Sequence, residues 1–218
     1  MTSFPGSPHV LKAGLVLVDA RSGQVLRIIN LQYNPDTLTR SLQLQTTGGD
    51  GPRSEATRFK GPAVETIRLE AEIDASDQLE FPDGNRTYVD HGIQPQLAVL
   101  ESLAHPTSRQ LRRVDADASS GTLEIAPMEA PLLLFVWGRD RVVPVRLTEL
   151  SITEEAFDPA LNPIRAKVTF GLRVLSVDDL GFGHKGGSLF MAYLESKERL
   201  AGQATSGTFT SLGIDRIG

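Results

Sequence analysis

Cysteine is absent from the 218 residues of this chain. Its absence excludes disulfide bonds, thiol nucleophiles, zinc ribbons and cysteine-ligated iron–sulfur clusters. The sequence also has no run of about 18 apolar residues, the length that a membrane-spanning helix requires. Residues 1–8 lack the charged start and apolar stretch of a secretory signal. We therefore expect a cytoplasmic protein that does not insert into a membrane.

An excess of positive charge is missing as well. The 22 basic and 27 acidic residues give a net charge of -5, and the pI is about 5.4. This composition offers no basic surface to a nucleic acid, so we expect no nucleic-acid partner. With 40% hydrophobic residues, a chain of this length can bury one sizeable core. One main domain and a tail are therefore expected.

Two segments alternate between apolar and polar residues. Within residues 65–74, apolar residues occupy the alternate positions from 67 to 73, and charged residues stand between them. Residues 166–174 repeat the pattern, with Lys167, Thr169 and Arg173 between the apolar positions. This period of two is typical of strands with one buried and one solvated face. Strands of a parallel sheet covered on both faces usually lose the polar half. The alternation therefore predicts antiparallel sheet.

Shorter β-rich runs occupy the first part of the chain. Residues 12–19 and 24–30 are separated by a turn-forming Ala-Arg-Ser-Gly stretch, which predicts a hairpin. Residues 38–45 predict a third strand. The polar, glycine-rich residues 46–61 are too hydrophilic to bury, so an exposed loop is expected there.

A further group of strands is predicted in the second half. The apolar run 131–137 indicates a buried strand, and a Gly-Arg-Asp turn at 138–140 leads into a long strand over 141–152. Pro144 lies early in that long strand. Because proline cannot donate a ladder hydrogen bond, we expect an edge or a bulge near it.

Two segments show helical periodicity. Residues 95–104 place apolar side chains three and four positions apart, with proline at a favourable first-turn position. Residues 188–200 begin at Ser188, a residue type that caps helix N-termini. The order of elements predicts a mainly β, α+β domain over residues 1–176. Residues 177–218 are expected to form a glycine-rich linker, a short helix and a C-terminal tail.

Residues 181–186 match the G-x-G-x-x-G pattern of dinucleotide sites. That pattern functions when a helix N-terminus receives the pyrophosphate and a following parallel strand presents an acid about 20 residues later. Fewer than about 20 residues follow the predicted helix, and they contain no strand-like run. We therefore interpret the segment as a flexible linker without a cofactor.

Residues 115–121 carry oxygen-bearing side chains at alternate positions, as a calcium loop does. The glycine stands one place late for an EF-hand, and no glutamate follows at the twelfth position. A solvated hairpin loop is the preferred interpretation, and a calcium site is the alternative. The histidines show no metal-binding spacing, and no G-x-S-x-G elbow exists. We expect no metal site and no enzymatic activity.

Several segments together resemble one protein family. Residues 31–41 (LQYNPDTLTRS) are similar to the aromatic-Asn-Pro-x-x-Leu-x-x-Ser segment near the start of contractile injection system tube proteins. Residues 131–138 (PLLLFVWG), 143–157 and 163–168 (PIRAKV) resemble three strands near the end of the same family domain. The similarity covers roughly residues 10–176. The candidate family-motif and assembly positions are Tyr33, Asn34, Pro35, Leu38, Phe135, Trp137, Gly138 and Arg165.

The resemblance implies a fold of two packed antiparallel sheets, a tail-tube-like barrel or sandwich, with one inserted helix. It also implies a structural role in a phage-tail-like particle, either released or acting inside the cell. There the chain would form a hexameric ring that starts the tube or joins it to the baseplate. The implied partners are copies of the chain itself, the inner tube protein, and spike and baseplate proteins. The loop at 46–64 is a candidate contact.

Two observations keep the interpretation open. Many adaptor members of the family continue into a LysM domain, whereas only residues 177–218 follow the resemblance here. Composition and alternation by themselves are also typical of a stand-alone β-sandwich that binds a small ligand or a carbohydrate. Stabilisation of a monomer in a ligand screen would favour that alternative.

Overall fold

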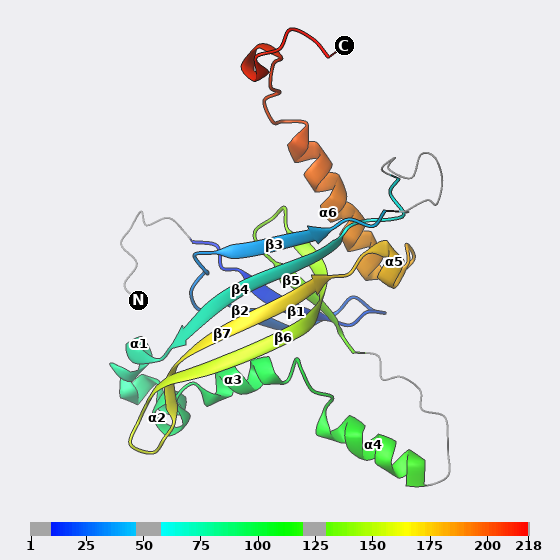
Figure 1. Ribbon diagram of the computed structural model, residues 1–218. Helices are drawn as coiled ribbons and strands as arrows, with labels where there is room; N and C mark the ends of the chain where they lie inside the picture. Colours follow the sequence, from blue (N-terminus) through cyan, green and yellow to red (C-terminus); the bar gives the residue numbers. More distant parts are fainter. Residues whose placement is uncertain (1–9, 47–57, 120–129, 218) are drawn as a thin grey trace.

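The computed structural model describes residues 10–46, 58–119 and 130–217 (Figure 1). Their seven strands form one antiparallel sheet in the order β2-β1-β5-β6-β7-β4-β3. The strands are β1 Gly14–Val18, β2 Val25–Asn30, β3 Leu38–Gln43, β4 Val64–Asp74, β5 Leu132–Val136, β6 Val142–Phe157 and β7 Pro163–Val174. Every strand expected from the sequence is present, and β1 and β2 form the expected hairpin.

The period-two segments became adjacent strands of this sheet. Leu69 of β4 lies opposite Phe170 of β7, and both side chains are buried. Along β4, buried and exposed residues alternate from Glu65 to Glu72. The predicted antiparallel sheet with one buried and one solvated face is confirmed for this strand.

The described strands belong to one curved sheet, so the expected pair of packed sheets is not confirmed. The 16-residue β6 pairs with β5 at its start and with β7 along most of its length, which keeps the ladder continuous. The twist of long strands lets such a sheet curl around its own core. Leu15 of β1 and Leu69 of β4 accordingly line one small pocket, although β5, β6 and β7 separate them in the strand order. β2 and β3 remain edges, so the sheet is not a closed barrel.

Pro144 lies inside the sheet and not at an edge, because β6 is flanked by β5 and β7. Its carbonyl accepts a hydrogen bond from the Leu175 N–H at 2.9 Å. The nitrogen and carbonyl of one strand residue point to the same side, so the proline nitrogen faces the point where β7 ends at Val174. The missing N–H of Pro144 therefore leaves no strand hydrogen bond unmade. The irregularity of β6 comes later, between Leu147 and Glu149.

Six α-helices lie in the described residues. They are α1 Ser76–Leu79, α2 Arg86–His91, α3 Gln94–Glu101, α4 Ser108–Ser119, α5 Val177–Leu180 and α6 Lys185–Ala201, with 3-10 turns at Pro82–Gly84 and Thr210–Leu212. The predicted helices correspond to α3 and α6. The others escaped prediction because they are short or, like α4, bury no residue.

Helices α3 and α6 close the core. Leu97 and Leu100 of α3 join the same buried cluster as Phe190 and Tyr193 of α6 and the inner faces of the strands. Leu189 of α6 instead packs on a smaller cluster around Leu132, on the other side of β5. The first half of α6 therefore contacts apolar side chains from both faces of the sheet. Each large apolar side chain buried in this way stabilises the docking by about 2 kcal/mol.

The glycine-rich segment differs from the expected linker. Gly186 and Gly187 already belong to α6 and are buried. A side chain at Gly187 would overlap the Gly181 carbonyl oxygen. His184, and not Ser188, caps the helix, because its Nδ1 accepts the Gly186 N–H at 3.0 Å. The segment is thus a close-packed turn into α6.

The candidate calcium segment is helical over residues 115–119, where it forms the end of α4. Side chains two positions apart on a helix point to different sides, so the Asp115 and Asp117 carboxylates do not converge on one ion. Residues 120–121 lie outside the described part of the chain. So do residues 47–57, most of the predicted contact loop. Among the described helices, none is long and apolar enough to cross a membrane.

Candidate assembly site

The first motif segment connects the two edge strands of the sheet. Asn34 bonds to the chain just before β1: its Oδ1 accepts the Ala13 N–H at 2.9 Å, and its Nδ2 donates to the Leu11 carbonyl at 2.7 Å. The Leu31 N–H adds a third bond, to the Ala13 carbonyl. The segment between β2 and β3 is therefore fixed to the β1 end of the sheet.

Gln32 makes the corresponding connection to the far side. Its Nε2 donates to the Asp74 carbonyl at 2.7 Å, and its Oε1 accepts the Asp74 N–H at 3.0 Å. A side-chain amide that bonds both backbone groups of a residue replaces a rung of β-ladder. Together, Gln32 and Asn34 span the gap between the β1 end and the β4 end of the curved sheet.

The remaining residues of this motif differ in exposure. Tyr33 is 44% exposed, and its hydroxyl contacts only the Gln32 amide among the described residues, at 3.4 Å. Leu38 packs on the core, and Pro35 is half-buried. Of the four motif positions on this segment, Tyr33 is thus the large side chain available to a partner.

The second motif begins in the core at Phe135 and ends at the protein surface at Gly138. Phe135 is 1% exposed and is enclosed by the protein's own side chains. Trp137 is half-buried, with its ring centroid 5.9 Å from that of Phe135. Gly138 has φ of 77° in the turn before β6, a conformation that favours glycine. Phe135 therefore supports the fold, while Trp137 and Gly138 line a surface pocket beside Tyr193.

Arg165 joins β7 to the end of β4. Its Nε donates to Asp74 Oδ2 at 2.7 Å and lies 3.6 Å from a carboxylate oxygen of Glu72. Burial raises the pKa of Asp74, but hydrogen bonds from Ser76 and Arg165 outweigh burial and hold that pKa below its usual value. Asp74 is thus hydrogen-bonded to Gln32 through its backbone and to Arg165 through its side chain.

A charged cluster fixes α6 to the sheet, and the sequence-based interpretation missed it. The carboxylate of Glu65, 3% exposed, accepts hydrogen bonds from Arg40 at 2.7 Å, Lys197 at 2.9 Å and Tyr193 at 3.0 Å. Arg40 also donates to the Tyr193 hydroxyl. The signal was present in the alternation, since Glu65 is a charged residue on the apolar face of β4 that carries Ile67.

The ionisation of this cluster follows from its contacts. Burial raises the pKa of Glu65, but the hydrogen bonds from Arg40 and Lys197 outweigh burial and bring that pKa below its usual value. Burial and the negative charge of Glu65 raise the pKa of Tyr193 to about 12. At neutral pH the cluster therefore holds one carboxylate, two cations and a neutral phenol, and nothing in it resembles a catalytic nucleophile with its base.

Comparison with known proteins assigns the family. Residues 16–179, more than half of the chain, match the family model described as "Contractile injection system tube protein". The chain belongs to this family. Its members are structural components of phage-tail-like particles, as the resemblance of the two motifs implied. Within the described ranges, no group of three or more histidine or carboxylate side chains is arranged to hold a metal ion.

Among curated proteins, none matches the chain. Two solved structures of gene transfer agent particles align with it. One is the tail of an empty particle solved with C6 symmetry, at 10% identity, over 75% of this chain and 90% of that chain, with a TM-score of 0.29. The other is the virion of a native particle, at 10% identity, over 74% and 90%, with a TM-score of 0.27. The assignment of this tube-family member rests on the sequence match.

The two edge strands of this tube-family member expose apolar side chains. On β2, Val25, Leu26 and Ile28 are more than half exposed. On β3, Leu42 is 54% exposed. Each edge strand pairs on one side only within the described sheet. An edge with free backbone groups and apolar side chains is prone to pair with another chain.

Proposed function

We propose that this chain forms a closed, hexameric ring with copies of itself, and that the ring starts the inner tube or joins it to the baseplate and spike. Membership of the tube family makes it a structural component of a contractile injection particle. The ring, its copy number and its place at the end of the tube are the proposed part.

The observation that carries the ring is the pair of open edges. β2 and β3 stand at opposite ends of the strand order, so each copy offers two different edges. Contact between the β2 edge of one copy and the β3 edge of the next is heterologous, and such contacts close into a ring when their rotation divides a full turn. The exposed Ile28 and Leu42 would become buried at that contact.

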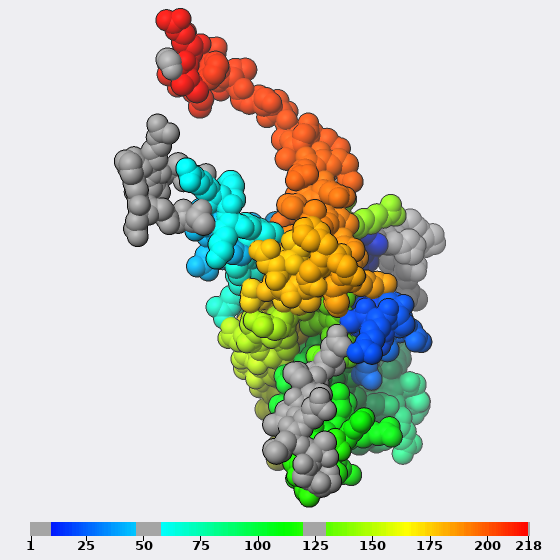
Figure 2. All heavy atoms as spheres, turned by 90° about the vertical axis from the view of Figure 1, so that its right-hand side faces the viewer, coloured from blue at the N-terminus to red at the C-terminus, as the bar shows by residue number. Residues whose placement is uncertain are grey.

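The C-terminal region supports a place at a junction between layers. The end of α6 and residues 202–217 rise from the body as a stalk (Figure 2), and all of residues 202–217 are exposed. A ring of such copies would present several stalks from one side. That arrangement suits a subunit that connects layers of different composition.

The ring is tested on the purified full-length chain by mass photometry and negative-stain electron microscopy. Rings or short tubes are expected, together with co-purification of tube, spike and sheath proteins from the producing cell. Leu42→Lys places a charge on the β3 edge and should convert rings to folded monomers. Val114→Lys, an exposed position on α4, is the matched control and should leave the rings intact.

Two results would contradict this proposal. A wild-type chain that stays monomeric at all concentrations and is absent from injection particles would remove the ring. A monomer whose melting temperature rises with a small ligand or a carbohydrate would instead favour the binding-module function.

A further inference from the structure

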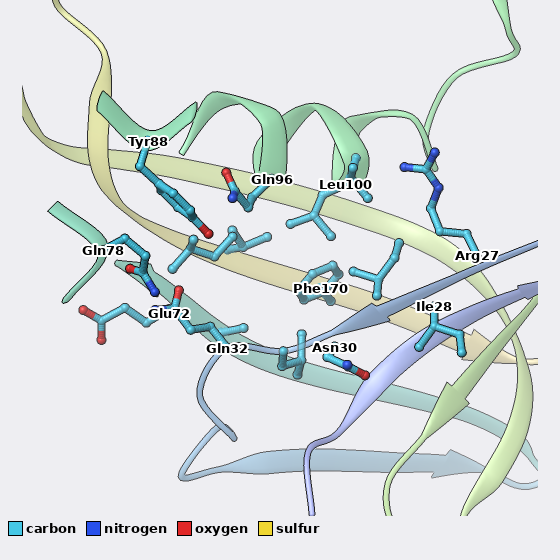
Figure 3. A pocket seen from close by; sticks show the side chains of 16 residues that line it. Arg27, Ile28, Asn30, Gln32, Glu72, Gln78, Tyr88, Gln96, Leu100 and Phe170 are labelled. Atoms are coloured by element: carbon cyan, nitrogen blue, oxygen red, sulfur yellow. The ribbon is translucent and has the colours of Figure 1, made fainter. Parts of the chain in front are cut away.

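A pocket of about 390 Å³ opens beside the β2 edge (Figure 3). Phe170 of β7 lies at its floor, and Tyr88 and Gln96 extend from α2 and α3 on the opposite side. Residues 27–32, from β2 and the segment after it, form its third side. The pocket therefore adjoins the free backbone groups of an edge strand.

Two polar atoms of this pocket are unsatisfied in the described structure. The Oε1 atoms of Gln78 and Gln96 are buried and accept no hydrogen bond. A buried acceptor without a partner loses its hydrogen bonds to water and destabilises the folded chain. Backbone N–H groups of an inserted segment, or its hydroxyl groups, would supply the missing donors. The site thus favours a polypeptide with polar and apolar residues over a purely apolar ligand.

A second pocket, of about 800 Å³, lies on the other side of Arg27. Leu17, Leu103 and Leu133 contribute its apolar lining, and Arg27 lines both pockets. In the described part of the chain, the Arg27 guanidinium has no hydrogen-bonded or ion-paired partner. We call the two pockets together the Arg27 groove. Its lining is mostly apolar. Of the two charged side chains that line it, Arg27 has no partner in the described structure, whereas Glu72 lies 3.6 Å from Arg165.

The chain itself contains a segment of complementary character. The residues after α6 expose the large apolar side chains Phe209, Leu212, Ile214 and Ile217. Asp215 stands among them and has no partner in the described structure. Serine, threonine and backbone donors lie between the apolar positions. This segment, residues 203–217, matches the Arg27 groove in apolar content and in hydrogen-bond donors. Its net charge is zero because Arg216 follows Asp215, so the charge match is confined to the Asp215 carboxylate and the Arg27 guanidinium.

The direction of the stalk selects a neighbouring copy as the receptor. α6 is anchored in its second half, through Tyr193 and Lys197, and the chain beyond these residues points away from the body (Figures 1 and 2). Every one of residues 203–217 is exposed on its own copy. An extended segment of this length reaches about 50 Å, enough to cross to an adjacent subunit.

We propose that residues 203–217 of one copy dock in the Arg27 groove of a second copy, where the Asp215 carboxylate accepts hydrogen bonds from Arg27. The exchange fills the Arg27 groove beside β2, satisfies the two glutamine acceptors and buries four apolar side chains, and it leaves the β2 edge to the β3 edge of the neighbouring copy. It rests on the proposed self-assembly of the chain. Neighbouring copies of the ring would then be joined by the docked C-terminal segment as well as by their sheet edges.

The absence of cysteine makes disulfide trapping a clean test. Full-length chains carrying Asn30→Cys and Ile214→Cys, each with a different tag, are mixed under conditions of assembly and oxidised. A disulfide between the two chains is expected. The matched control pairs Ile214→Cys with Glu70→Cys, on the exposed face of β4, and should give little cross-linked product.

Charge reversal separates the ion pair from general proximity. Arg27→Glu or Asp215→Arg alone should reduce the rate of cross-linking about tenfold, and the two together should restore it. Rings on electron micrographs with cross-linking no greater than in the Glu70→Cys control would overturn the docking and leave the ring standing. Monomers without any cross-link would overturn both.

Two further outcomes are decisive. Cross-linking between the two tagged chains in the absence of rings would support the docking and contradict the ring. A chain carrying both cysteines that forms its disulfide only within itself, and never between tags, would overturn the exchange between copies.

Discussion

The side-chain amide of Gln32 forms two hydrogen bonds with the backbone of Asp74, a residue 42 positions later in the chain. Asn34, two positions on, does the same at the opposite side, with Leu11 and Ala13. These two amides fix the segment between β2 and β3 to the chain before β1 and to the end of β4. The motif segment between the edge strands is therefore a structural clasp, and Tyr33 between them faces outward.

Gln32→Ala should lower the free energy of unfolding by about 1–3 kcal/mol, because it leaves the Asp74 backbone groups without partners. The measurement is urea denaturation of the monomeric Leu42→Lys background, which separates folding from assembly. Gln43→Ala, on the exposed part of β3, is the control and should change stability by less than about 0.5 kcal/mol. Equal effects of the two substitutions would show that the clasp contributes nothing.

Glu65→Gln keeps the shape of the side chain but removes the charge shared by Arg40 and Lys197. The loss of charge-assisted hydrogen bonds should lower the free energy of unfolding by about 2 kcal/mol. Limited proteolysis should then cut near α6 more readily. Glu149→Gln breaks an exposed ion pair with Arg68 and should cost less than about 0.5 kcal/mol. Unchanged protection of α6 in Glu65→Gln would refute this anchoring role.

Stability should fall as pH rises from 10 towards 12, in part through Tyr193. The pKa of this phenol is raised from 10.0 to about 12 in the folded chain. Over that interval the unfolded chain releases the proton first, so ionisation favours unfolding. Tyr193→Phe cannot ionise, and its free energy of unfolding should decline less steeply with pH. Parallel pH profiles for the two proteins would contradict the raised pKa.

Gly92→Ala should destabilise the fold by more than about 2 kcal/mol. Gly92 joins α2 to α3 at φ of 57°, and an added Cβ would overlap the Pro163 carbonyl oxygen at the start of β7. That carbonyl also accepts the Ile93 N–H. The overlap would therefore disturb the hydrogen bond that attaches the start of α3 to β7. Thermal unfolding measures the loss. Gly84→Ala, with open space around the new Cβ, should be close to neutral, and an equal loss there would rule out the steric cause.

Much of the fold was visible in the sequence because alternation is a local property. The strands at 65–74 and 166–174 were predicted from their own residues, and so were the hairpin and helices α3 and α6. Glu65 could have been recognised too, as a charge on the apolar face of a strand. Helix α4 was missed although Leu111, Val114 and Ala118 repeat at helical spacing, because the end of this segment was interpreted as a solvated loop.

The sequence alone determined the strands, the mainly β class and the absence of cysteine chemistry, and its two motifs indicated the family. Only the tertiary structure decided that one curved sheet takes the place of two, that Pro144 lies inside it, and that Arg40, Glu65 and Lys197 meet. The physical reason is that alternation specifies which face of a strand is buried, but not which strand lies beside it. Partners more than one hundred residues apart, such as Glu65 and Lys197, are brought together only when the sheet curls around its core.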